Sequence, residues 1–354
     1  MNSSQAVVVC EDGTVFPGYH FGAQGTAIGE LVAPTAMTGD HVLISSGAYA
    51  GTIGVFTTPF IGVSGVSKPA SQLGIAMAGV ISRERPQKPS HWRSHQSLED
   101  TLVANATVGI YGVDTRALTQ HLRRSGACNV GIFSSAPTRM ADAVHRVSHH
   151  SVTTDTLIGQ TSGPSPSSYP DQPNVAVVDL GMGAALRNIL STRGYSVALF
   201  PATSPAEKIL DTGASRVILS GGPGNPSDAT IGLGLVRDLL STDQPVLGLG
   251  LGHQLIARAL GFATRRLENA HHGTNHPVRH TETARVSITT HCHSHTVDFA
   301  NDPSIIVTHT SLHDGSVEGF KLADRPVSGL QFHPQGHPGP QDAFNQLTSF
   351  LKDS

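Results

Sequence analysis

The pattern of hydrophobic positions changes character about halfway along the chain. In residues 1–150 the apolar runs are short and separated by Gly, Asp and Ser turn signals. The β-branched run at 6–9 predicts a strand, and the run at 42–44 predicts another. An apolar face over 116–124, with Asp114 as the N-terminal cap, predicts a helix. This half is therefore expected to consist of short strands with one clear helix.

A segment rich in proline, serine and glycine separates the two halves. Residues 163–170 have the sequence Gly-Pro-Ser-Pro-Ser-Ser-Tyr-Pro, which is typical of a loop rather than of a helix or strand. We therefore expect a first domain over 1–150, a linker over 151–173 and a second domain over 174–354.

Apolar strands alternate with amphipathic helices beyond this segment. Strands are predicted at 175–179, 196–200, 216–219 and 245–249, and helices at 184–193, 206–210 and 253–260. Alternation at this spacing favours an open, mostly parallel α/β sheet.

The sharpest local motif lies where the last of these strands meets its helix. Residues 248–254 read Gly-Leu-Gly-Leu-Gly-His-Gln, so an apolar strand enters a glycine-flanked turn and a helix leaves it. This is the layout of a nucleophile elbow, in which the middle residue is exposed on a strained turn. Backbone N–H groups at the start of the following helix can stabilise an oxyanion. The middle residue here is Gly250, which has no side chain with which to attack a substrate.

Residues 248–254 resemble the Gly-Ile-Cys-Leu-Gly-His-Gln elbow of class I glutamine amidotransferases, in the form found in the small subunit of carbamoyl phosphate synthetase. Other segments resemble the same subunit in the same order along the chain: residues 11–14, 35–39, 114–119, 220–226, 271–278, 308–315 and 331–334. The resemblance implies an α/β fold with an N-terminal small-subunit α/β domain. A C-terminal class I amidotransferase domain with a mostly parallel sheet would follow it.

The resemblance also implies a reaction and a partner. In this family the small subunit hydrolyses L-glutamine, and the ammonia passes through a tunnel to a large ATP-dependent subunit. That subunit makes carbamoyl phosphate from bicarbonate and ATP, for arginine and pyrimidine synthesis. This chain has no P-loop or ATP-grasp signature. We therefore expect no cofactor here, with ATP used by the large subunit.

The catalytic positions depart from the family pattern. Gly250 stands where the family has its nucleophilic cysteine, while His333 matches the catalytic base. Gln335 replaces the glutamate that orients this base, and a neutral amide does not stabilise an imidazolium as a carboxylate does. Ala36 replaces a serine that contacts glutamine in the family. We therefore expect the chain's own glutaminase activity to be lost.

The substrate-binding positions are partly kept. The resemblance assigns glutamine contacts to Gly222, Gly224, Leu251 and Gln254. Turn geometry explains the two glycines equally well. The family's Gln-Asn-His-Gly-Phe loop becomes His-Cys-His-Ser-His at 291–295, which gives three further substrate-facing positions: Cys292, Ser294 and His295.

Two other interpretations of this loop remain open. Cys292 could be a relocated nucleophile, although it would lack the elbow and its oxyanion donors. His291, His293 and His295 alternate, so on a strand they share one face, and three imidazoles on one face can bind zinc. The chain has 20 histidines, however, so a histidine-rich surface explains the loop as well. Our predicted site contains no metal.

The composition of the chain argues against several classes of protein. The net charge of −3 and the absence of a basic stripe argue against nucleic-acid binding. Three scattered cysteines are too few for a disulfide framework and fit a reducing compartment. No apolar run approaches the ~18 residues of a membrane span, and no signal peptide is visible, so we expect a cytoplasmic protein with no membrane partner.

Three functional hypotheses follow. The first is a small chain that still delivers glutamine nitrogen to a large subunit. The second is a pseudoenzyme, a non-catalytic regulatory or scaffold subunit of a synthetase that uses free ammonia. The third is a paralogue recruited to another pathway. The family resemblance favours the first hypothesis, whereas Gly250 and Gln335 favour the second.

Overall fold

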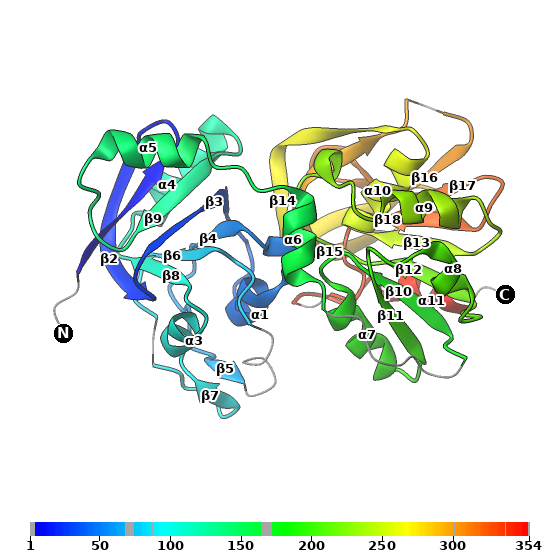
Figure 1. The fold of residues 1–354 in the computed structure, drawn as a ribbon, viewed down its shortest axis with the longest axis horizontal. Helices are drawn as coiled ribbons and strands as arrows, with labels where there is room; N and C mark the ends of the chain where they lie inside the picture. The colour runs from blue at the N-terminus through cyan, green and yellow to red at the C-terminus, as the bar shows by residue number, and fades with distance from the viewer. Residues whose placement is uncertain are drawn as a thin grey trace. The chain divides into compact units, whose positions relative to one another are not determined.

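A computed structural model describes residues 4–67, 74–86, 88–163, 172–300, 302–336 and 338–352 (Figure 1). The chain divides into two compact units, Met1–Val152 and Thr153–Ser354. None of the helices in these described ranges is long and apolar enough to cross a membrane.

Seven strands of the first unit close into a barrel. In order around the barrel they are β1 (Gln5–Cys10), β2 (Val15–Gly22), β8 (Val108–Tyr111), β6 (Gly79–Ser82), β4 (Thr52–Phe56), β3 (Thr26–Val32) and β9 (Asn129–Phe133). Fully buried β-branched side chains such as Val8, Ile53 and Ile132 fill its interior. The strand predicted at 6–9 is confirmed as part of β1.

Short helices and a two-stranded ribbon complete the first unit. They are α1 (Asp40–Ser45), η1 (Gly47–Tyr49), α3 (Leu98–Ala104), α4 (Thr115–Ser125), α5 (Met140–Ser148), β5 (Val66–Ser67) and β7 (Ser94–Gln96). The predicted helix and its cap are confirmed, because the Asp114 side chain accepts a hydrogen bond from the Ala117 N–H in α4. The strand predicted at 42–44 is wrong, since these residues lie in α1. A three-residue apolar run has no period that separates helix from strand.

Part of the expected linker is helical. Helix α6 (Thr154–Thr161) lies within 151–173 and begins at Thr153, whose side chain accepts a hydrogen bond from the Thr156 N–H. The capping threonine is the helix signal that the proline-rich composition obscured. Most of the Pro/Ser-rich stretch, 164–171, lies outside the described residues.

The second unit is built on a nine-stranded sheet. Its order is β11 (Val197–Pro201), β10 (Val175–Asp179), β12 (Arg216–Leu219), β13 (Val246–Leu249), β18 (Val327–Leu330), β17 (Val317–Leu322), β16 (Ile305–Ser311), β14 (Ala263–His280) and β15 (Val286–Asp298). The strands from β11 to β18 are parallel, as expected for this part of the chain. The remaining neighbours pair antiparallel.

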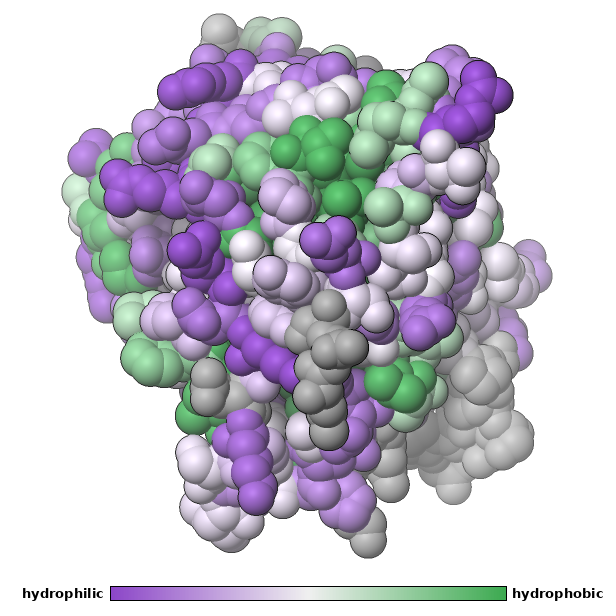
Figure 2. Space-filling view, turned by 90° about the vertical axis from the view of Figure 1, so that its left-hand side faces the viewer, coloured by the Kyte–Doolittle hydropathy of each residue, from purple (hydrophilic) through white to green (hydrophobic). Residues whose placement is uncertain are grey.

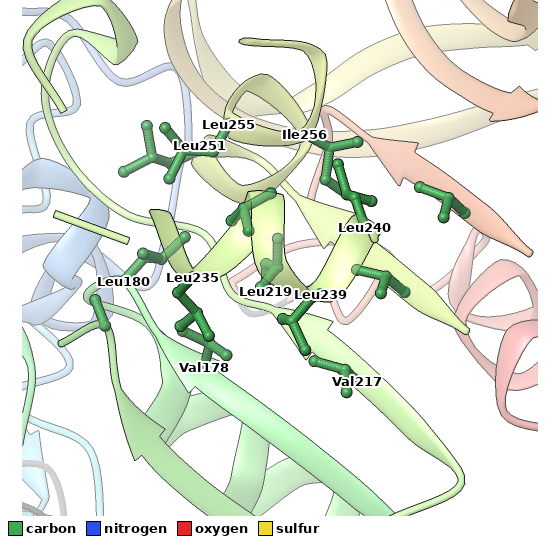
Figure 3. Close-up of a cluster of buried hydrophobic side chains, with 14 of the residues drawn as sticks. Val178, Leu180, Val217, Leu219, Leu235, Leu239, Leu240, Leu251, Leu255 and Ile256 are labelled. Atoms are coloured by element: carbon green, nitrogen blue, oxygen red, sulfur yellow. The ribbon is translucent and has the colours of Figure 1, made fainter. Parts of the chain in front are cut away.

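Helices cover both faces of the parallel part of the sheet. They are α7 (Gly183–Ser191), α8 (Ala206–Leu210), α9 (Leu233–Leu240), α10 (Leu251–Ala259) and α11 (Phe344–Lys352), with a short η2 (Pro226–Asp228). Because side chains alternate along a strand, Val178 of β10 packs with Leu239 and Leu255 on one face (Figure 3), while Val177 packs with Leu186 on the other. Burial on both faces explains the continuous apolar runs of these strands.

Candidate functional site

The connection between β13 and α10 has the backbone of a nucleophile elbow. β13 ends at Leu249, Gly250 has φ 52° and ψ −111°, and α10 begins at Leu251. The Gly250 N–H donates a hydrogen bond to the carbonyl of Leu330 at the end of β18 (2.9 Å). A positive φ is strained for residues with a Cβ, and such strain exposes the nucleophile in an elbow of this kind.

The glycines on either side of the elbow are required by close backbone contacts. A Cβ at Gly248 would lie 2.5 Å from the carbonyl oxygen of Gly252. A Cβ at Gly252 would lie 2.5 Å from the carbonyl oxygen of Leu219 in β12. The tight packing of α10 on the sheet therefore demands both glycines, whatever residue stands between them.

The vacant nucleophile position faces an imidazole. A Cβ built on Gly250 would lie 3.2 Å from Cε1 of His333, and the next neighbour would be Cα of Gly221 at 3.4 Å. The backbone N–H of His333 donates to the carbonyl of Thr290, which holds the segment after β18 against β15 (2.9 Å). The structure therefore brings the nucleophile position and the base position together, although they are far apart in sequence.

The imidazole of His333 lies in surroundings that favour its neutral form. Its side chain is buried, and burial lowers its pKa to about 4. Within the described part of the chain neither ring nitrogen has a hydrogen-bond partner, and neither does Oε1 of the buried Gln335. The amide of Gln335 therefore does not orient the ring, and no carboxylate stabilises its protonated form.

Packing accounts for the two glycines assigned to substrate binding. A Cβ at Gly222 would overlap the carbonyl oxygen of Leu180. Gly224 has φ +90°, and a Cβ there would overlap the hydroxyl of Thr154 in α6. Close packing thus requires glycine at both positions, independently of any ligand.

Leu251 and Gln254 both point into the protein from α10. Leu251 belongs to the hydrophobic core beside the sheet (Figure 3). The Gln254 amide Nε2 donates to the carbonyl of His295 (2.8 Å) and to Oε1 of Gln331 (2.9 Å). Both amide hydrogens are therefore used to tie α10 to β15 and to the segment after β18.

The histidine-rich loop of the sequence forms the middle of β15. His291, His293 and His295 are buried on one face, and Cys292 and Ser294 alternate with them toward the other. His295 does not join the other two in a common cluster; His271 of β14 and Glu318 of β17 do. The sequence analysis did not identify Glu318. The only indication of it in the sequence is that an acidic residue lies within an apolar strand segment.

Comparison with known proteins places the chain in a family. Residues 8–132 match the family described as "Carbamoyl-phosphate synthase small chain, CPSase domain", and residues 176–352 match "Glutamine amidotransferase class-I". The carbamoyl phosphate synthase small chain of Streptomyces avermitilis is 35% identical over 371 residues, covering 98% of this chain and 96% of the relative. The pyrimidine-specific small chain of Lactiplantibacillus plantarum is 35% identical over 350 residues, covering 97% of this chain and 94% of the relative.

Among solved structures, a glutamine amidotransferase from Thermotoga maritima is similar to part of the chain. It is 21% identical with a TM-score of 0.38, and the match covers 46% of this chain and 76% of that protein. The two family matches and the near full-length relatives identify the lineage: the chain belongs to the carbamoyl-phosphate synthase small-chain family.

Proposed function

We propose that this chain is the small subunit of a carbamoyl phosphate synthetase that no longer hydrolyses glutamine. It holds and stabilises a large ATP-dependent subunit that takes its nitrogen from free ammonia. The observation that carries this proposal is Gly250 at the elbow, with the ring of His333 3.2 Å beyond its missing Cβ.

The proposal follows from what glutamine hydrolysis requires. A thiolate must attack the side-chain amide carbon, and a base must take up the thiol proton and later protonate the departing ammonia. Gly250 supplies no attacking atom. Direct attack by water would depend on His333, whose pKa of about 4 makes it a weak base near neutral pH.

The first unit supports a scaffold role. Its barrel core is fully packed, and it exposes large apolar side chains that include Tyr19, Phe60 and Trp92, the last with 80% of its surface accessible. Figure 2 shows one face of the molecule, on which hydrophobic side chains gather above the centre. Exposed aromatic residues are typical of protein interfaces. We propose that this unit makes most of the contact with the large subunit, over an interface on the order of 2,000 Å² or more.

The first test addresses chemistry. The purified chain, alone and with a large subunit, would be treated with glutamine and with a glutamine-like electrophile, and the protein analysed by mass spectrometry. We expect no covalent adduct and a carbamoyl phosphate rate that depends on ammonia but not on glutamine. An adduct at any residue would contradict the proposal, and an adduct on Cys292 would indicate a relocated nucleophile.

The second test addresses partnership. Co-purification and size-exclusion chromatography should give a stable complex with the large subunit, weakened by Trp92→Ala. Val286→Ala removes a half-exposed apolar side chain from the second unit and should leave the complex intact. If the chain runs alone at every concentration and changes neither the stability nor the rate of the large subunit, the scaffold role is wrong. Recruitment to another pathway would then be the better hypothesis.

A further inference from the structure

Four buried ionisable side chains converge from three strands of the antiparallel part of the sheet. His271 comes from β14, His291 and His293 from β15, and Glu318 from β17. One potential ligand atom from each lies within 4.8 Å of all the others, and no member of this histidine cluster exposes more than 7% of its surface. The cluster takes no part in the function proposed above.

Hydrogen bonds on the outside of the cluster determine the tautomers of the two β15 histidines. The Thr289 hydroxyl donates to the carbonyl of His276 (2.9 Å), so it accepts from Nε2–H of His291 (2.7 Å). A carbonyl oxygen only accepts, so Nδ1 of His293 carries the hydrogen that bonds to the carbonyl of His295 (2.8 Å). The inner nitrogens, Nδ1 of His291 and Nε2 of His293, therefore present lone pairs to one another at 3.0 Å. Two facing lone pairs repel unless a cation lies between them.

The third histidine is held from outside in the same way. Nε2 of His271 lies 3.0 Å from Oδ2 of Asp314, which leaves Nδ1 directed at Oε1 of Glu318 (3.4 Å). Oε2 of Glu318 is 3.5 Å from Nδ1 of His291, and its Oε1 is 3.7 Å from Nε2 of His293. A carboxylate behind a ligating histidine is the usual outer partner in metal sites, because it orients the ring and makes the inner nitrogen more basic.

The spacing of the inner atoms fits one tetrahedral ion. Zinc–nitrogen bonds of about 2.0–2.1 Å place neighbouring ligand atoms of a tetrahedron about 3.3 Å apart. The contact between His291 and His293 and the contacts of the two Glu318 oxygens with the three rings span 3.0–3.7 Å, and all four ligand atoms lie within 4.8 Å of one another. Imidazole nitrogens with one carboxylate suit zinc, whereas magnesium and calcium prefer oxygen ligands.

We propose that this histidine cluster is a structural zinc site whose ligands are Nδ1 of His271, Nδ1 of His291, Nε2 of His293 and a carboxylate oxygen of Glu318. Four protein ligands leave no open position, which is typical of a structural rather than a catalytic zinc. The ion ties β14, β15 and β17 together. It replaces our expectation, from the sequence, of a site without metal.

A single proton satisfies only part of the cluster. On His271 it would serve Asp314 and Glu318 but leave the lone pairs of His291 and His293 facing each other. Between His291 and His293 it would join those two rings but leave the lone pair of His271 Nδ1 facing the carboxylate of Glu318. The site also includes a residue that departs from the family pattern that residues 291–295 resemble, because that pattern has glutamine at position 291. His291→Gln therefore introduces a residue that suits the fold and removes one ligand.

The test is the zinc content of the full chain. Protein purified without a histidine tag and dialysed against a weak chelator should contain about one zinc per chain by elemental mass spectrometry. His291→Gln and Glu318→Gln should each lower the content to less than about a tenth of that. Two control variants should keep it: His309→Gln, a buried histidine of β16 outside the cluster, and His149→Gln, from an exposed stacked pair of imidazoles.

Two further readouts make the result decisive. Cobalt substitution should give the visible absorption of a tetrahedral site in the wild type and not in His291→Gln. Added zinc should raise the melting temperature of the wild type only, with circular dichroism confirming that each variant is folded. A wild type that remains nearly free of zinc after zinc is added would overturn the proposal, as would His291→Gln binding as much as the wild type. Neither outcome depends on glutamine or on a large subunit.

Discussion

The elbow and the histidine cluster both bury imidazoles in the second unit, but their surroundings differ. At the elbow, neither ring nitrogen of His333 has a hydrogen-bond partner within the described residues. In the cluster, each imidazole is held from outside: His271 by a carboxylate, His291 by a hydroxyl and His293 by a backbone carbonyl. The imidazole at the elbow thus lacks polar contacts among the described residues, whereas the side chains of the cluster are arranged around a common point.

The two regions differ in what accounts for their residues: close backbone packing at the elbow, and polar contacts between side chains in the histidine cluster. Gly248 and Gly252 are needed because α10 lies against the sheet, so packing alone accounts for the backbone of the elbow. Glu318 is fully buried beside three imidazoles, and burying a carboxylate is unfavourable unless an opposite charge compensates it. That charge comes either from His271, whose pKa lies above its ordinary value because Glu318 and Asp314 outweigh the effect of burial, or from the zinc ion proposed above.

The largest effect is expected when the cluster loses its carboxylate. Glu318→Ala should lower the free energy of unfolding by about 3–5 kcal/mol, because it leaves buried polar groups and a cation without their negative partner. Urea denaturation measures this change. Glu282→Ala removes an exposed carboxylate from the same unit and should change stability by less than about 0.5 kcal/mol. Equal changes in the free energy of unfolding for the two substitutions would show that the buried carboxylate stabilises the protein no more than an exposed one does.

A smaller loss is expected when the elbow backbone is crowded. Gly252→Ala should destabilise the protein by about 3 kcal/mol, because the new Cβ meets the backbone of Leu219, which cannot move aside as a side chain can. Gly159→Ala is the matched control, since that glycine lies in α6 with open space around it and should gain up to about 1 kcal/mol. If both variants match the wild type in thermal melts, packing does not maintain the elbow.

The pH dependence of stability tests whether His333 is held neutral. Burial sets its pKa at about 4 in the folded protein, below the ordinary value of about 6.5, so the unfolded chain binds more protons between these values. The contribution of His333 to stability is therefore retained above pH ~6.5 and lost as pH falls, by about 1.5 kcal/mol between pH 6.5 and 5. His333→Gln should lose about 1.5 kcal/mol less over this interval. Parallel curves for the two proteins, measured by urea denaturation at each pH, would show that the ring titrates freely.

The smallest effect is expected from restoring the thiol. Gly250→Cys should cost about 1 kcal/mol, because a side chain is strained at φ 52°. It should also recover little glutaminase activity, since members of a catalytic triad act as a unit and Gln335 and the altered 291–295 segment remain. Ammonia release from glutamine measures this, with Gly250→Cys/Gln335→Glu expected to exceed the single variant. Full activity in the single variant would mean that the thiol was the only loss.

Local pattern was enough to predict the elements around the elbow. Helix 206–210 and strand 216–219 have the predicted bounds, and the strand, glycine turn and helix at 246–259 follow the predicted order. These features depend on residues close together in the sequence, such as the glycines that bracket position 250. The strand predicted at 42–44 was wrong, and helix α6 within the expected linker was not predicted, because short apolar or proline-rich runs do not specify one local structure.

The histidine cluster depends on contacts that only the folded sheet creates. Alternation along β15 indicated that His291 and His293 share a face, but it also included His295, which contributes a backbone carbonyl and no ring nitrogen. His271 joins them because the register of β14 places it directly opposite His293, between two irregularities in the pairing. Glu318 arrives from β17, a strand that pairs with neither β14 nor β15. Register and the approach of distant strands are set by tertiary packing, so no local pattern could have selected these two residues.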